Sequence, residues 1–122
     1  MTTAALVEIL KQNVCSSQEL KESFHNESKK VLIKLAEKLG LKKNEYEIRS
    51  SMGNKRISGV IVLHTDKLYI QIFQSLNDNM MRYRACNGRK DCSGDAINYI
   101  HVQKMLDDDF VANLMTLKWT VV

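Results

Sequence analysis

The sequence predicts an α+β fold with N-terminal helices, a four-stranded antiparallel β-meander and a C-terminal helix. Three observations predict it. Apolar residues recur at helical spacing up to Gly40, they alternate along the chain from Tyr46, and helical spacing returns after Asp109. A chain of 122 residues is long enough for one hydrophobic core. We therefore expect a single domain over residues 1–122.

Two helices are expected over about residues 3–40. Ser16 followed three residues later by Glu19 has the spacing of a capping box, which predicts that the second helix begins near Ser17. Residues 25–28 interrupt the apolar stripe and indicate a break, and Gly40 suits the end of the helix. An alternative interpretation of residues 16–40 is a helix-turn-helix followed by a β-hairpin wing at residues 46–64.

The sheet is expected over about residues 45–86, in four strands near residues 46–49, 57–64, 68–74 and 80–86. The second of these strands is apolar on both faces, which is typical of a strand covered on both sides. Short connections favour an antiparallel meander.

A polar, glycine-containing loop is expected at residues 87–96, and residues 98–102 are compatible with either a strand or a loop. The acidic residues 107–109 suit the start of a C-terminal helix over about residues 107–118.

Composition and cysteine usage predict a cytoplasmic protein with no membrane span. Hydrophobic residues make up 44% of the chain and charged residues 26%, and no apolar run reaches the roughly 20 residues that a span needs. Met1–Leu10 contains Glu8 and no basic residue, which is not expected of a secretory signal. The odd number of cysteines (Cys15, Cys86 and Cys92) favours reduced thiols.

Positive charge is concentrated in the middle of the chain. Residues 42–90 contain ten Lys and Arg against four Asp and Glu, whereas residues 91–122 contain two against five. The net charge of the whole chain is +4. A basic segment followed by an acidic one indicates either a surface that faces a polyanion or an ordinary solvated surface of two signs.

The alternation of the strands places basic and aromatic side chains together on one face of the predicted sheet. Such a face can stack bases and neutralise the phosphates of single-stranded RNA or DNA. In the alternative interpretation, the C-terminal helix covers the aromatic residues and the arginines lie at the rim. The candidate binding residues are Arg49, Tyr69, Phe73, Arg82, Arg84, Arg89 and Lys90.

We expect neither an enzyme nor a cofactor. The cysteines and histidines lack the tight ligand pair that a zinc site needs, so no metal site is predicted. A small thiol-dependent enzyme remains an alternative, with Cys86 or Cys92 as nucleophile and His64 or His101 as base.

Two segments carry a resemblance to a protein group. Residues 58–72 (SGVIVLHTDKLYIQI) and residues 83–91 (YRACNGRKD) resemble small, mostly uncharacterised tailed-phage proteins. In that group the second motif ends with a tyrosine, a hydroxyl residue and two glycines, and this chain departs from it at Cys92 and Asp95. The matching stretch covers about residues 57–98.

The resemblance implies a small non-enzymatic protein made in an infected bacterial cytoplasm. It implies a phage-encoded inhibitor, active in anti-defence or host takeover, that docks on a bacterial protein or nucleoprotein complex that handles nucleic acid. Direct binding of RNA or single-stranded DNA by the basic and aromatic sheet face is the alternative.

Overall fold

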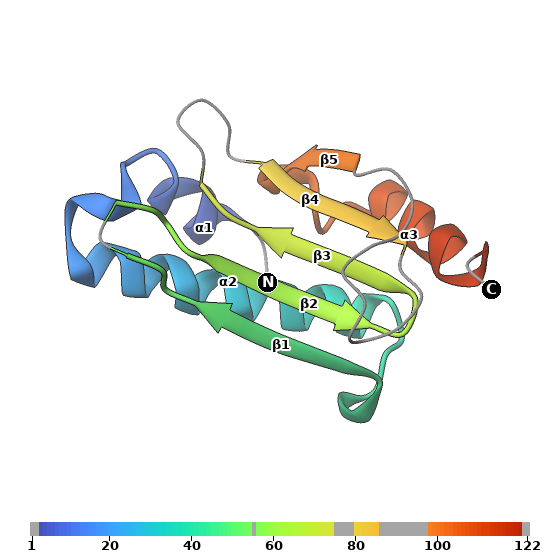
Figure 1. Ribbon diagram of the computed structural model, residues 1–122. Helices are drawn as coiled ribbons and strands as arrows, with labels where there is room; N and C mark the ends of the chain where they lie inside the picture. Colours follow the sequence, from blue (N-terminus) through green and yellow to red (C-terminus); the bar gives the residue numbers. More distant parts are fainter. Residues whose placement is uncertain (1–2, 55, 75–79, 86–97, 121–122) are drawn as a thin grey trace.

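The computed structural model describes residues 3–54, 56–74, 80–85 and 98–120, and these form helices packed on one side of an antiparallel sheet (Figure 1). The helices are α1 (Ala4–Ile9), α2 (Gln18–Lys38) and α3 (Asp108–Thr120), and the strands are β1 (Tyr46–Ser51), β2 (Val60–Thr65), β3 (Leu68–Ile72), β4 (Met80–Ala85) and β5 (Asn98–His101). Short 3-10 turns, η1 (Val14–Ser16), η2 (Lys43–Glu45) and η3 (Val102–Lys104), connect them. Within this part of the chain no helix is long and apolar enough to cross a membrane.

The predicted α+β class and the antiparallel meander are confirmed, but the predicted number of strands is wrong. The described strands form one sheet in the order β1-β2-β3-β4-β5, five rather than four. The additional strand is β5, which lies in the segment that the sequence predicted to be either a strand or a loop. It is only four residues long, and it is held by pairing with β4, in which Arg82 lies opposite Tyr99 and Met81 opposite Ile100. Strand pairing of this kind depends on a neighbour and not on a local pattern.

The hydrophobic core lies between α2 and the middle of the sheet. Ile61 and Leu63 of β2 and Ile70 of β3 are fully buried against Leu32 and Leu35 of the helix. The next residues along β2 point to the other face and are also buried, with Val62 6% exposed and His64 0% exposed. The prediction that this strand is covered on both faces is therefore confirmed.

Helix α2 runs for 21 residues without interruption, so the predicted break at residues 25–28 is wrong. This segment contains neither proline nor glycine, and His25 and Ser28 face inward and are buried. The continuous helix also rules out the helix-turn-helix interpretation, because that motif needs a turn within residues 16–40.

The ring of His25 joins α2 to the sheet. Its Nε2 lies 2.8 Å from the Ser58 carbonyl oxygen, and its Nδ1 lies 2.8 Å from the Ser50 hydroxyl. Because a carbonyl only accepts, Nε2 carries the proton and Nδ1 accepts from Ser50. Burial lowers the pKa of His25; the Ser58 carbonyl opposes this shift and the nearby Lys21 adds to it. The neutral ring is thereby favoured.

Helix α3 packs on the same face of the sheet as α2. The Phe110 ring lies 5.1 Å from the Tyr83 ring in an edge-to-face contact. Tyr83 alternates along β4 with Arg82 and Arg84, so those two arginines point to the opposite face. The described part of α3 therefore does not cover the basic and aromatic side chains, and the interpretation in which this helix hides them is wrong.

Candidate functional site

Strand register brings five of the side chains on the face opposite the helices into one group. Gln71 of β3 lies opposite Arg82 of β4, and Tyr69 lies opposite Arg84. Phe73, just beyond the end of β3, follows on the same face by alternation. All five side chains are partly exposed. We call this group the arginine–aromatic face; it consists of Tyr69, Gln71, Phe73, Arg82 and Arg84.

Each arginine of this face is stacked on an aromatic ring. The Arg82 Cζ lies 4.2 Å from the centre of the Phe73 ring, and the Arg84 Cζ lies 5.5 Å from the centre of the Tyr69 ring. Both distances are within the roughly 6 Å at which a cation is attracted by the electrons of a ring. Tyr69 is fixed in turn by an edge-to-face contact with His64 at 5.1 Å. Each guanidinium group is therefore held against a ring of the same face.

The Nε atoms of Arg82 and Arg84 are buried and have no hydrogen-bond partner. Neither arginine forms an ion pair with any of the residues that the structure describes. A buried N–H group without an acceptor is uncommon in folded proteins and costs free energy. Within the described residues, the positive charge of both arginines is therefore unmatched.

Arg49 lies on the same face but has partners. Its Nη1 donates to the Glu47 carboxylate at 2.8 Å, and its Nη2 donates to His64 Nδ1 at 2.7 Å. Since a guanidinium only donates, His64 Nδ1 is an acceptor and the ring is the tautomer with its proton on Nε2. The charge of Arg49 is therefore already compensated within the protein.

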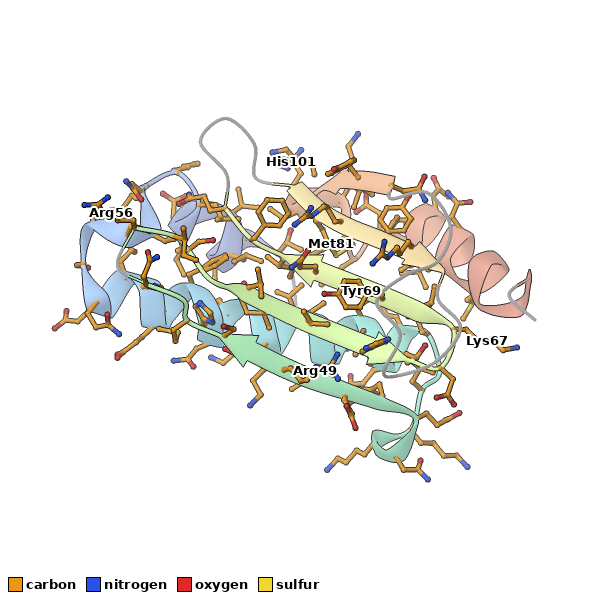
Figure 2. All side chains as sticks on the ribbon, in the orientation of Figure 1. Arg49, Arg56, Lys67, Tyr69, Met81 and His101 are labelled. Carbon is orange, nitrogen blue, oxygen red and sulfur yellow. The ribbon has the colours of Figure 1, made fainter. Side chains whose placement is uncertain are left out.

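A pocket of about 120 Å³ lies beside the two unmatched arginines, lined by Tyr69, Gln71, Arg82, Tyr83 and Arg84. Figure 2 shows Tyr69 over the middle of the sheet, from which this pocket is built. The volume is several times the 10–15 Å³ that one water molecule requires. A small oxyanion would therefore fit between the arginines.

The structure brings together four of the seven residues that the sequence predicted as binding residues: Tyr69, Phe73, Arg82 and Arg84. Arg49 shares their face, but it is engaged with Glu47 and His64. Arg89 and Lys90 lie outside the described residues, as does the whole predicted polar loop at residues 87–96.

Sequence reasoning missed two residues of this region. Gln71 lies on the predicted face and was not selected, because an amide carries neither charge nor a ring. Tyr99 is 55% exposed and lies opposite Arg82 on β5. The sequence left residues 98–102 compatible with either a strand or a loop, so it could not place this ring beside the arginine.

Both candidate nucleophiles of the thiol-enzyme alternative, Cys86 and Cys92, lie outside the described residues. Cys15 is a half-buried free thiol in η1. Among the residues with a described placement, no group of three His, Cys, Asp or Glu side chains could hold a metal ion. The thiol-enzyme alternative stays a prediction.

No protein-family model, curated protein or solved structure matches this chain. The resemblance to tailed-phage proteins therefore stays a prediction, and the chemistry of the arginine–aromatic face carries the functional conclusion.

Proposed function

We propose that this protein is a non-enzymatic binding protein that binds single-stranded RNA or DNA through its arginine–aromatic face. One observation carries the proposal. Arg82 and Arg84 each lie on an aromatic ring, and neither forms an ion pair with a residue that the structure describes. A polyanion supplies the negative charge that these two guanidinium groups lack within the described residues.

A single strand suits this face better than a duplex does. The arginines lie on a sheet, and the described helices pack on its other side, so a helix that could enter a major groove is not at the site. A guanidinium stacked on a ring leaves its outer surface as a flat platform, and unpaired bases stack on such planes. Phosphates of the same strand would then lie within reach of the Nη donors.

The proposal is tested by measuring binding of fluorescently labelled RNA and DNA oligonucleotides at increasing salt concentration. We expect affinity to fall steeply with salt, because phosphate contacts release counterions. The double variant Arg82→Ala with Arg84→Ala should bind at least about tenfold more weakly. Its slope of log affinity against log salt should be smaller by about 1.4, since each single-strand phosphate contact contributes roughly 0.7.

A matched control removes the same charge elsewhere. Lys29 and Lys30 are exposed residues of α2, on the helical layer of the molecule. The double variant Lys29→Ala with Lys30→Ala should keep most of the affinity, whereas an equal loss in both variants would indicate a non-specific effect of net charge. Absence of binding by the unmodified protein, even at low salt, would remove the proposal.

Docking of the same face on a bacterial protein or nucleoprotein complex is a second candidate function, which one observation favours. Tyr99 is 55% exposed beside Arg82, and tyrosine and arginine are enriched where protein interfaces have their strongest contacts. The same titration separates the candidates, because a face that binds only protein would give no oligonucleotide binding at any salt concentration.

A further inference from the structure

We propose that the pocket between Arg82 and Arg84 binds a phosphate monoester, which in a nucleic-acid strand is the phosphate at its end. The inference deepens the proposed function and rests on it. It concerns which phosphate of the strand this pocket prefers.

The surroundings of the pocket are defined by the rings on which the two arginines stack. Gln71 lies directly opposite Arg82 and beside Tyr69 along β3. The Arg82 guanidinium stacks on Phe73, on one side of Gln71, whereas the Arg84 guanidinium stacks on Tyr69, on the other side. Gln71, both arginines and Tyr69 line the pocket of about 120 Å³, together with Tyr83. Figure 2 labels Tyr69, one of the lining residues.

The guanidinium groups that line this pocket can donate to several oxygen acceptors of one ligand. Arg82 and Arg84 are two residues apart on one strand, so their Cα atoms are about 6.6 Å apart and their side chains leave the same face. The Nε atoms of both residues are buried, so the Nη–H groups are the donors that a ligand can reach. The two Nη groups at the end of a guanidinium form a fork that donates to two oxygens of one phosphate. A phosphate monoester has three free oxygens to share between two forks, whereas a phosphodiester within a strand has two.

Charge favours the monoester for the same reason. Two guanidinium groups carry two positive charges, and no acidic side chain in the described part of the chain pairs with either of them. Glu47 of the same face is bound to Arg49. A monoester carries about −1.5 to −2 at neutral pH, because its second pKa is near 6. A phosphodiester carries a single negative charge and would leave the charge of one guanidinium unmatched.

The experiment compares oligonucleotides of one sequence that differ only at their ends. The first oligonucleotide carries a 5′-phosphate, the second a 3′-phosphate and the third no terminal phosphate. In the first two, the fluorophore is attached to the end without the phosphate. The third is prepared in two forms, with the fluorophore on one end or on the other. We expect a strand with a terminal phosphate to bind at least about tenfold more tightly than the strand without one. Arg82→Lys with Arg84→Lys should abolish this preference while retaining weaker binding, because lysine keeps the charge and lacks the fork. Lys29→Ala with Lys30→Ala should retain the preference.

The failure of this inference is distinguishable from the failure of the proposed function. Equal affinity for the strands with and without a terminal phosphate would overturn the inference and leave strand binding intact. Binding of a nucleoside 5′-monophosphate that depends on both arginines, without binding of any strand, would support the monoester pocket and overturn the proposed function. Retention of the terminal-phosphate preference in the lysine variant would overturn the assignment of the pocket to these two guanidiniums.

Discussion

At the scale of single residues, two glycines share a backbone conformation and differ in what surrounds them. Gly40 and Gly59 both have a φ of +73°, which side chains of L-residues rarely adopt. A Cβ at position 40 would meet nothing within 4 Å. A Cβ at position 59 would collide with the Ser51 carbonyl oxygen and lie 2.9 Å from His25 Nε2. Gly59 is therefore required both for its backbone angle and for close packing between β1, β2 and α2.

We expect Gly59→Ala to lower the free energy of unfolding by at least about 2 kcal/mol more than Gly40→Ala does. The alanine at position 40 incurs only the cost of the left-handed backbone, about 1–2 kcal/mol. The alanine at position 59 adds a steric clash with a backbone atom that cannot move without disturbing the β1–β2 pairing. Urea denaturation of both variants measures the difference, and equal losses would show that the loop around Gly59 adjusts freely.

The two glycines also show what sequence predicts at this scale. Gly40 was assigned to the end of a helix from the apolar stripe before it, and the structure confirms this: Gly40 N donates to the Glu37 carbonyl and Leu41 N to the Ala36 carbonyl. Gly59 could not be assigned in the same way. Its neighbours Ser51 and His25 are distant in sequence, and a local pattern contains no information about them.

At the scale of elements, the start of α2 shows how far a motif can place a helix boundary. The spacing of Ser16 and Glu19 predicted a capping box, but the residue that caps the helix is Ser17. Ser17 has an extended backbone, and its hydroxyl accepts from the Leu20 N–H at 3.0 Å. Ser16 belongs instead to η1, where its N–H donates to the Asn13 carbonyl. Either serine hydroxyl could cap a helix, and Ser17 is the cap because Ser16 is part of the preceding 3-10 turn.

The adjacent serines provide a matched pair of variants. We expect Ser17→Ala to lower the free energy of unfolding by about 1 kcal/mol, because the Leu20 N–H loses its acceptor at the end of the helix. Ser16→Ala should change it by less than about 0.5 kcal/mol, since the hydrogen bond that Ser16 makes in η1 comes from its backbone. Chemical denaturation of both variants tests this. A larger loss of unfolding free energy for Ser16→Ala than for Ser17→Ala would show that Ser16 caps the helix, as the sequence predicted.

At the scale of the whole molecule, the sheet separates a face packed against the helices from the arginine–aromatic face. Alternation along the strands predicted which residues share the arginine–aromatic face, because the side-chain period of a strand is two and does not depend on its neighbours. The sequence could not predict the stacking of Arg82 on Phe73 or the pocket over Gln71, because both depend on the pairing register of β3 with β4. The same limit applies to Tyr99, whose place beside Arg82 depends on the pairing of β5.

The side chain of Gln74, just beyond β3, connects the N-terminal segment to this sheet by hydrogen bonds. Its Oε1 accepts from the Val14 N–H at 2.9 Å, and its Nε2 donates to the carbonyls of Gln12 at 2.8 Å and Leu10 at 3.3 Å.

We expect Gln74→Ala to lower the free energy of unfolding by about 2 kcal/mol, because three backbone groups lose their partner. It should also accelerate hydrogen exchange at the Val14 amide, since that N–H is no longer held. Gln71→Ala is the control: it removes the same type of side chain from β3, on the pocket side, and it should leave both the stability and the Val14 exchange nearly unchanged. If the two variants lost equal stability and Val14 exchanged equally slowly in both, the segment would be held by the apolar contacts of Leu6, Leu10 and Val14 alone.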